Sequence, residues 1–361
     1  MKVQNVRWAV LGIILICSMV LNYLHITAGT VFPSVHAICP LGGFENLQVW
    51  LSGHANLQKL FSGTMTLFFF TLGFSLIFGR SICGNICPFG ALVEFIGKIS
   101  PIKGSIPHTI DEGMRYLKYV ILVIVIAMAW ITASLWISPY DPYVAYAHIW
   151  SGAELVDENG IGLLILIGVL ACSLVITRFF CRYLCPAGAM FALISVAGIT
   201  KVTRTECTEC GICTQRCPMG IEPGRKTLIN NTECIGCTTC VDGCPSHKGL
   251  EMTIAGKKVN PLIFVLGTVC IFFGTIALLS TLSLMQVTIP SPDSVLGGEA
   301  LLNPIDLRGS MTIEEGAMYV GMNLTEFYTL MEIPDSVPPA TLLKRVQNYV
   351  PGYDFHAVKA K

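Results

Sequence analysis

The chain has 361 residues, of which 53% are hydrophobic and 13% charged, and its formal net charge is zero. A soluble domain carries about a quarter charged residues, so the composition excludes an ordinary soluble protein and indicates a protein that lies in a lipid bilayer. The balanced charge gives no electrostatic basis for binding nucleic acid.

Apolar runs predict about five transmembrane helices, each of which needs about 20 residues to cross a bilayer. The runs cover about 8–28, 64–79, 117–138, 161–177 and 261–285. The second and the fourth are short unless flanking residues extend them. Because backbone polar groups in lipid must be hydrogen-bonded internally, we expect every run to be helical.

Basic residues between the runs predict the orientation. Segment 80–118 holds five Lys or Arg and segment 178–260 holds ten, whereas 29–63 holds only Lys59 and 139–160 holds none. The positive-inside rule therefore places the N-terminus and the two basic segments in the cytoplasm, and the residues after the fifth run outside the cell. We expect a multi-pass protein of the cytoplasmic membrane.

The chain contains an internal repeat. Residues 80–91 read RSICGNICPFGA and align at a constant offset with residues 178–189, RFFCRYLCPAGA. Each copy follows an apolar run and ends on the predicted inner side. The membrane part is therefore predicted to contain two related two-helix units.

Each copy carries a CxxxCP motif. Cys83 and Cys87, like Cys181 and Cys185, are four residues apart and can share one face of a helix. If the two units pack as a pseudo-symmetric pair, the four thiols converge near the inner membrane surface. They would then hold a metal cluster or form a dithiol/disulfide couple; a purely structural break in the helix is the third alternative.

Aromatic residues gather in the outer segment between the third and fourth runs, at Trp136, Tyr140, Tyr143, Tyr146 and Trp150. An interfacial belt is the favoured interpretation, because amphipathic rings settle at the headgroup level. The lining of a quinone pocket is the alternative.

Eight of the sixteen cysteines form two runs of CxxCxxCxxxCP between residues 207 and 245. This spacing matches the bacterial two-cluster ferredoxin motif, in which the fourth cysteine of each run ligates the other cluster. The motif assigns one 4Fe–4S cluster to Cys207, Cys210, Cys213 and Cys244. It assigns a second to Cys217, Cys234, Cys237 and Cys240.

Zinc and disulfides are the competing interpretations of these cysteines. Zinc sites usually pair two separated CxxC knuckles rather than four cysteines within eleven residues twice over. Disulfides are rare in a cytoplasmic segment. Iron–sulfur ligation is therefore favoured.

The tail from about 304 is predicted to be a small helical module. Thr312 with Glu315, and Asn323 with Glu326, have the spacing of capping boxes, and a third helix is expected near 340–348. Nothing in the tail has a catalytic pattern, and a docking role is the alternative to inertness.

Taken together, the apolar runs, the two CxxxCP motifs at 83–88 and 181–186 and the tandem run at 207–245 resemble the membrane polyferredoxins of the NapH and NosR type, which include FixG/CcoG-like proteins. The resemblance implies electron transfer between the quinone pool or another membrane donor and a partner redox enzyme. It also implies, for some relatives, a role in metalloenzyme maturation or regulation. The chain lacks the large outer flavin domain of NosR-type members.

We therefore predict an α-helical integral membrane protein with an inserted cytoplasmic α+β ferredoxin domain. The expected parts are a four-span membrane domain at 1–200, a ferredoxin domain at 201–255, a fifth helix at 256–290 and an extracytoplasmic helical tail at 291–361. The predicted function is membrane-bound electron transfer through two 4Fe–4S clusters, with a third at the CxxxCP pairs left open. An electron-transfer subunit is favoured over a stand-alone enzyme. An assembly or redox-regulatory factor that uses the CxxxCP thiols is the alternative.

Overall fold

The computed structural model describes residues 3–28, 42–44, 47, 62–101, 104, 107–132, 136–223, 232–246, 249–282, 284, 307, 311–350, 352–353, 355 and 358. Its α-helices are α1 (Val3–Ala28), α3 (Ser62–Phe78), α4 (Ser81–Asn85), α5 (Pro88–Ile99), α6 (His108–Arg115), α7 (Leu117–Thr132), α8 (Pro142–Ala147), α9 (Ala153–Val175), α10 (Phe179–Tyr183), α11 (Pro186–Ser195), α12 (Ile212–Arg216), α13 (Thr239–Asp242), α14 (Pro261–Thr281), α16 (Ile313–Val320) and α17 (Leu324–Leu330). Short 3-10 helices lie at Ser138–Tyr140, Ile149–Ser151 and Leu343–Asn348, and the strands are β1 (Thr200–Arg204), β2 (Leu250–Ile254) and β3 (Lys257–Lys258).

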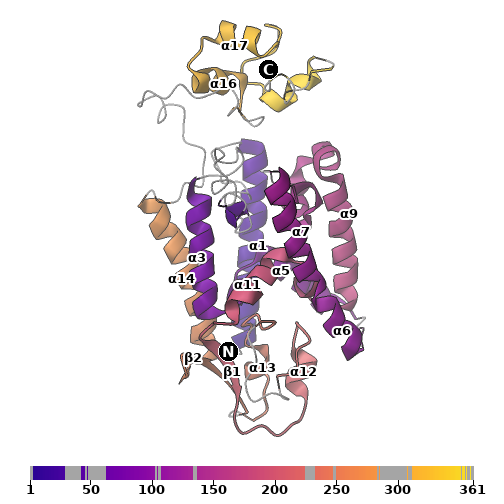
Figure 1. Cartoon of the computed structure of the whole chain (residues 1–361), viewed down its shortest axis with the longest axis vertical. Helices are drawn as coiled ribbons and strands as arrows, with labels where there is room; N and C mark the ends of the chain where they lie inside the picture. The colour runs from indigo at the N-terminus through magenta and orange to yellow at the C-terminus, as the bar shows by residue number, and fades with distance from the viewer. Residues whose placement is uncertain are drawn as a thin grey trace.

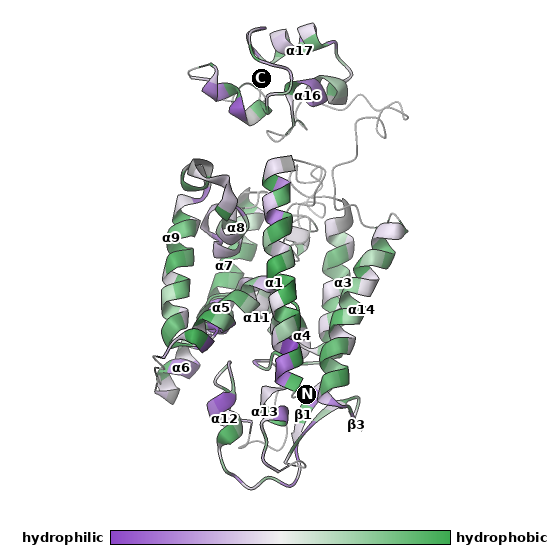
Figure 2. Ribbon diagram, turned by 180° about the vertical axis from the view of Figure 1, so that it is seen from behind, coloured by the Kyte–Doolittle hydropathy of each residue, from purple (hydrophilic) through white to green (hydrophobic). Residues whose placement is uncertain are grey.

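Long apolar helices run side by side through the middle of the molecule (Figure 1). The described residues contain three helices long and apolar enough to cross a membrane, at Val3–Thr27, Thr109–Ile131 and Pro261–Thr281. The second and fourth predicted runs form the shorter apolar helices α3 and α9. Large apolar side chains such as Leu164 and Ile263 are 70% and 65% exposed. Outward-facing apolar surface of this extent is what lipid covers, and it follows the long helices in Figure 2.

The internal repeat is visible in the helix bounds. Helix α10 begins at Phe179, 98 residues after α4 begins at Ser81, and both helices have five residues. In each unit a short helix, α5 or α11, follows the CxxxC turn and lies across the long helices (Figure 1). Helix α5 of the first unit packs on α9 of the second, and α11 of the second packs on α3 of the first. The short helix of each unit therefore packs on the long helix of the other unit, which is the arrangement expected of pseudo-symmetric partners.

A small antiparallel sheet, ordered β1-β2-β3, closes the ferredoxin segment. The register pairs Thr200 with Ile254 and Arg204 with Leu250, which brings the two ends of the segment together. The sheet is held to the membrane helices, because the Thr200 hydroxyl donates to the Ile77 carbonyl at 2.6 Å. The edge of the sheet therefore lies against the C-terminal end of α3, with Cys234 close by.

The first residues of α1 also contact the ferredoxin segment. The backbone amides of Val3 and Gln4 donate to the Asp242 carboxylate at 3.4 and 3.3 Å. The N-terminal end of α1 and the ferredoxin segment thus lie at the same end of the molecule (Figure 1). This arrangement agrees with the predicted orientation; that this end is cytoplasmic stays a prediction.

Near the C-terminus, α16, α17 and the last 3-10 helix pack around their own apolar core, which includes Phe327 and Leu343. The predicted Thr312–Glu315 capping box is confirmed: the Thr312 hydroxyl accepts from the Glu315 amide at 3.1 Å, and the Glu315 carboxylate accepts from the Thr312 amide at 2.8 Å. The box predicted at Asn323 is wrong, because Asn323 begins α17 without a side-chain capping bond. The expected third helix is a 3-10 helix.

Candidate iron–sulfur and thiol site

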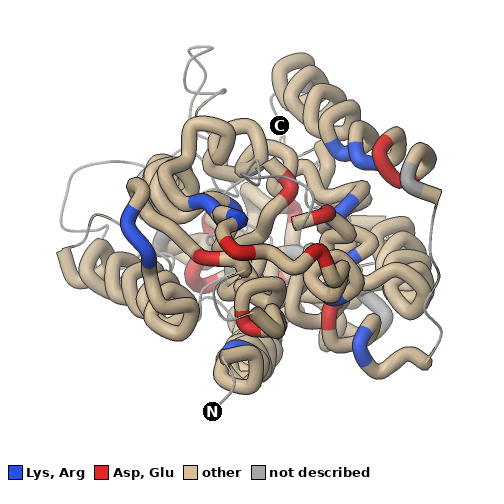
Figure 3. The backbone as a smooth tube through the Cα atoms, turned by 90° about the horizontal axis from the view of Figure 1, so that it is seen from below, with Lys and Arg blue, Asp and Glu red and all other residues tan. Residues whose placement is uncertain are grey.

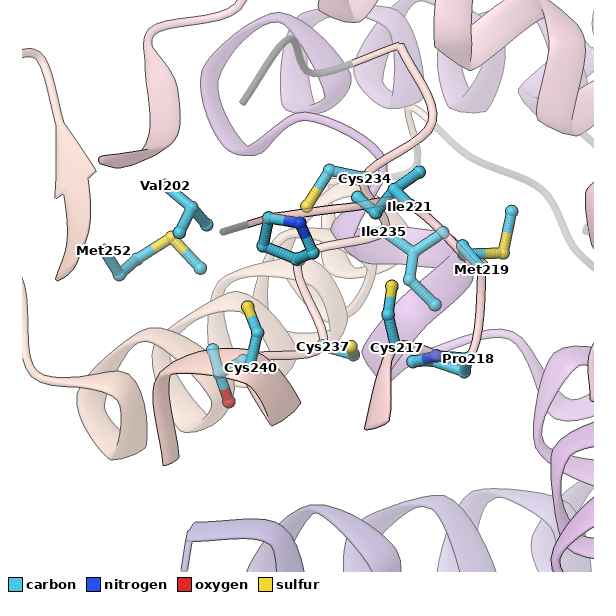
Figure 4. Close-up of a pocket in the computed structure, with 13 residues that line it drawn as sticks. Val202, Cys217, Pro218, Met219, Ile221, Cys234, Ile235, Cys237, Cys240 and Met252 are labelled. Carbon is cyan, nitrogen blue, oxygen red and sulfur yellow. The ribbon is translucent and has the colours of Figure 1, made fainter. Parts of the chain in front are cut away.

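One pocket in the ferredoxin segment is lined by Cys217, Cys234, Cys237 and Cys240 together with apolar side chains (Figure 4). These four are the ligand set that the sequence assigns to the second cluster. In Figure 4 the sulfurs of Cys217, Cys234 and Cys240 point into the space between them. Val202 and Met252, from the paired strands β1 and β2, form one wall. The sheet therefore supplies a dry boundary to a four-thiol cage.

Burial governs the chemistry of this cage. It raises the pKa of the Cys217 thiol to about 12 and that of Cys234 to about 11, so both sulfurs are protonated in the metal-free protein at neutral pH. Iron ligation requires thiolates, so binding releases these protons and repays the burial through metal–sulfur bonds. Four thiols in an apolar pocket fit a cubane whose corners need four sulfur ligands. When bound, such a cluster supplies one-electron transfer.

Of the other four ferredoxin cysteines, Cys213 is the one that the contacts place beside this pocket. Cys207 and Cys210 precede α12, Cys213 lies within it, and Cys244 follows α13. Helices α12 and α13 pack together, and Cys213 shares one apolar cluster with Cys240 of the first pocket. The two predicted ligand sets are thus neighbours. Among the described residues no group of three or more His, Cys, Asp or Glu side chains is arranged to hold a metal ion.

The two CxxxCP motifs meet. Cys181 is buried, and Cys83, Cys87 and Cys185 pack into the same cluster. Cys185 interacts electrostatically with each of the other three, and burial raises its pKa well above the ordinary value. The convergence that the repeat predicted is therefore present in the structure, although the sequences of the two motifs are almost a hundred residues apart.

The second cysteine of each motif caps a helix. Cys87 is the N-cap of α5, and its sulfur accepts from the Gly90 amide at 3.3 Å; Cys185 is the N-cap of α11, and its sulfur accepts from the Gly188 amide at 3.2 Å. The proline that follows each cysteine occupies the first helical position, where a missing N–H is tolerated. Each CP dipeptide therefore starts a helix and holds a sulfur at its positive end.

Two buried arginines, one from each repeat, donate hydrogen bonds to the other repeat. Arg178, from the second repeat, donates to the Cys83 carbonyl of the first; Arg80, from the first repeat, donates to the Cys181 carbonyl of the second at 3.4 Å. Arg80 and Arg178 occupy the same position in the two repeats and are 1% and 0% exposed. The CxxxCP site thus has approximate two-fold symmetry that extends to its charges.

Each arginine belongs to a group of two cations and one carboxylate. Arg178 and Arg7 share Glu94, with Arg7 Nη2 and Glu94 Oε2 at 2.7 Å. Arg80 and Lys118 share Glu233, at 3.3 and 2.5 Å. Seen from the ferredoxin end, acidic and basic positions gather over the centre of the molecule (Figure 3). Although burial alone would raise it, Arg178 and Arg7 lower the pKa of Glu94 to about 2, so this carboxylate is ionised.

Sequence reasoning missed this charge network. Arg80 and Lys118 were counted as charges of an inner loop, yet both are buried, because segment 80–118 folds back as α4, α5 and α6 rather than remaining a solvated loop. The available signal was the arginine that opens each copy of the repeat. A charge retained beside a duplicated cysteine motif suggests a partner in the other copy.

The predicted interfacial belt of aromatic residues is wrong in part. Trp150 is 50% exposed and Tyr140 38%, as an interfacial position requires. Tyr146, however, is buried against Phe89, and its hydroxyl lies 2.7 Å from that of Ser18. Helix α8 folds inward and carries Tyr146 into the cluster that holds Cys181, so this ring is part of the thiol site's apolar wall.

Family models match the same segments. A model described as a 4Fe–4S binding domain matches twice, at residues 63–107 and 158–203, and a 4Fe–4S dicluster domain matches residues 199–245. The double match coincides with the two repeats, and the dicluster match with the ferredoxin segment. No solved structure gives a significant match.

Several curated proteins are similar over the same part of the chain. An uncharacterized protein of Methanocaldococcus jannaschii, MJ0750, is 32% identical over 41% of this chain and 62% of its own length. The putative electron transport protein YccM of Escherichia coli is 29% identical over 50% and 53%, and the ferredoxin-type protein NapH of E. coli is 24% identical over 48% and 58%. The chain therefore spans about half to three fifths of these relatives. Proteins named NosR, NirI and MauN also match.

Three kinds of observation now agree. The long outward-apolar helices indicate a membrane protein, the cysteine cage carries the ferredoxin spacing, and the relatives bear ferredoxin-type names. The chain is a membrane-associated, ferredoxin-type protein similar to NapH and NosR.

Proposed function

We propose that this protein is an electron conduit that relays single electrons through two 4Fe–4S clusters between a soluble or subunit-borne carrier and a redox partner in the membrane. Cys207, Cys210, Cys213 and Cys244 hold one cluster, and Cys217, Cys234, Cys237 and Cys240 hold the other. The observation that carries the proposal is the position of the second cage, directly against the CxxxCP turn at the end of the membrane helices.

The second cysteine cage and the first CxxxCP turn are in close backbone contact. A Cβ added to Gly84 would lie 2.0 Å from the Ile235 carbonyl oxygen, and the Asn85 amide donates to the Gly236 carbonyl at 3.3 Å. Gly84 and Asn85 follow Cys83, while Ile235 and Gly236 lie inside the cluster run. An electron that leaves the second cluster thus meets the CxxxCP thiols next, without crossing solvent.

We propose the finer features together with the conduit. We assign five membrane helices, with α3 and α9 as the two short ones, a cytoplasmic ferredoxin segment at 201–255 and an extracytoplasmic tail at 291–361. The quinone pool is our choice of membrane-side reactant, since no described acid–base pair or nucleophile supports an independent turnover site. A third redox centre at the CxxxCP thiols, whether a cluster or a dithiol couple, completes the path.

The test is a reduction experiment on the whole protein, purified anaerobically in detergent. Reduced ferredoxin or a quinol is mixed with it, and the loss of iron–sulfur absorbance is followed in time. We expect reduction within seconds, and a Cys240→Ser variant that lacks the second cluster should pass no electrons to the membrane-side acceptor. A preparation with zinc in place of iron would refute the conduit.

The second candidate is an assembly or redox-regulatory factor for a metalloenzyme. The observation that favours it is the set of four CxxxCP thiols, and a relative bears the name "regulatory protein NosR". Failure to exchange electrons with quinol or ferredoxin, combined with binding of copper or of an apo-enzyme, would select this candidate.

A further inference from the structure

We propose that Cys83, Cys87, Cys181 and Cys185 together ligate one 4Fe–4S cluster, and that Arg80 and Arg178 balance its negative charge from opposite sides. The inference rests on the proposed conduit and decides between the two chemistries left open for its third centre. It makes the two arginines positioning residues that set the cluster's reduction potential.

Charge is the first argument. Arg178, Arg7 and Glu94 form a buried group with one net positive charge, and Arg80, Lys118 and Glu233 form a second. The four cations are at most 1% exposed. Uncompensated charge in such a place is strongly unfavourable. Each group therefore favours anions beside it. Arg80 and Arg178 interact electrostatically with CxxxCP sulfurs and also with Cys234 and Cys237 of the second cage, so both sites bear on this charge.

The charge of each alternative occupant separates the neutral ones from the dianions. An oxidised 4Fe–4S cluster with four thiolate ligands is a dianion, which neutralises the two groups. A disulfide, a pair of disulfides or four neutral thiols carries no charge and adds nothing to the compensation of the two groups. A zinc tetrathiolate is also a dianion, so charge does not separate it from the cluster, and the iron and zinc content of the protein distinguishes the two.

An unused donor is the second argument. Arg80 Nε is buried and has no hydrogen-bond partner among the described residues, although Nη1 and Nη2 donate to Thr232 and Cys181 carbonyls. The same guanidinium interacts electrostatically with Cys83, Cys181 and Cys185. A buried guanidinium N–H beside three sulfurs is placed to donate to a thiolate or a cluster sulfide, which is a charge-assisted bond.

Backbone geometry is the third argument. Arg178 has a φ of +58°, a left-handed conformation that is unfavourable for a long side chain. A Cβ on Gly188 would lie 2.9 Å from Arg80 Nη2, and one on Gly90 would lie 3.2 Å from Arg178 Nη1. Each motif thus keeps a glycine where the other repeat's arginine must pass. Local strain is thus present at Arg178, whereas Arg80 reaches the other repeat from a backbone with a φ of −79°.

The redox step is a simple one. One electron leaves the reduced second cluster of the ferredoxin segment and enters the third cluster, which becomes a trianion, and no proton or bond changes place. Because Arg80 and Arg178 stabilise the added negative charge, they make the third cluster easier to reduce than it would be in the same apolar pocket without them.

The first test counts iron and acid-labile sulfide in the anaerobically purified full-length protein. We expect about twelve irons per chain, and about eight in a Cys87→Ser/Cys185→Ser variant. Serine is itself a preferred N-cap, so α5 and α11 should keep their caps and the variant should keep its fold. Unchanged paramagnetic resonance of the two ferredoxin clusters in the variant is the control for folding.

The second test measures the third cluster's potential. Arg80→Gln should make its reduction harder by about tenfold in equilibrium constant, which is about 59 mV for one electron. Arg80→Lys should restore most of the loss, since charge is retained. The matched control is Lys257→Gln, which removes an exposed cation from β3 and should change nothing.

The outcomes separate this inference from the proposed function. Eight irons in the wild type, with the four CxxxCP sulfurs all reactive to a maleimide after denaturation, overturn the third cluster and leave the two-cluster conduit intact. Zinc or copper bound in place of iron, and lost in the Cys87→Ser/Cys185→Ser variant, also overturns it. Absence of iron from the whole protein overturns the conduit itself.

Discussion

The molecule holds two sets of buried cysteines that are built in opposite ways. The cage of Cys217, Cys234, Cys237 and Cys240 comes from one stretch of 24 residues, and its walls are apolar. The CxxxCP site comes from two repeats 98 residues apart, and buried cations surround it. The first set is specified by local spacing; the second exists only once the two units have packed.

This difference has consequences for stability. A ligand cage made from one segment can be assembled by the metal itself, because loop closure over a short segment is cheap. The CxxxCP site instead depends on ion pairs between distant elements, such as Arg7 of α1 with Glu94 of α5. Damage to the cage should therefore remove a cofactor, whereas damage to the ion pairs should weaken the whole membrane core.

The largest effect is expected at the cage. Cys237→Ser replaces a cysteine that is 8% exposed in the apolar cluster between the two sites. The variant should lose about four irons per chain and all electron transfer from the ferredoxin side to the membrane side. Iron quantification and absorbance kinetics check this. Cys270→Ser, at an exposed position on α14, is the matched control and should retain every iron.

Glu94→Gln tests the core. It leaves two buried guanidinium groups without their shared carboxylate and should destabilise the protein by about 3–5 kcal/mol. Glu251→Gln breaks the surface pair with Lys258, whose side chain is 63% exposed, and should change stability by about 0–1 kcal/mol. Thermal unfolding in detergent compares the two variants. Equal losses would contradict the buried network.

The pH dependence of Glu94 follows from its low pKa. Its folded-state pKa of about 2 lies below the ordinary 4.5, so its stabilising effect is complete above about pH 5 and is lost progressively as the pH falls from there through 2. The difference between the wild type and Glu94→Gln should therefore be constant between pH 6 and 8. A difference that grows across this range would mean that another group titrates at the site.

Sequence patterns predicted well those features of the structure that depend on the spacing of nearby residues. The cysteine spacing grouped four cysteines that line one pocket, and hydropathy located the three helices long enough to cross a membrane. The same patterns treated Arg80 and Lys118 as loop charges, because burial of a charge depends on partners that only the folded chain brings near. Tyr146 was misplaced for the same reason: α8 turns inward, and no local pattern marks that turn.

A smaller effect is expected where the repeats interlock. Gly188→Ala places a methyl group 2.9 Å from Arg80 Nη2 and 3.4 Å from the Cys185 sulfur, so the arginine must move. We expect a loss of about 1–3 kcal/mol and an altered spectrum of the CxxxCP cofactor, with the ferredoxin clusters unchanged. Gly73→Ala in α3 meets nothing within 4 Å and should be neutral or slightly stabilising. If both substitutions are silent, Arg80 is not held as tightly as its contacts indicate.

The smallest effect is expected in the C-terminal helices, far from either set of cysteines along the chain. Thr312→Ala removes the hydroxyl that caps α16, while its backbone amide can still donate to Glu315, and should cost about 1 kcal/mol in the local stability of α16. Asn323→Ala, at the N-cap of α17 that lacks a side-chain bond, should cost less. Hydrogen exchange of the α16 and α17 amides measures both. Because these helices have their own apolar core, iron content should stay at the wild-type level in each variant. A loss of iron on Thr312→Ala would mean instead that the C-terminal helices help to hold the cofactor-bearing part of the chain.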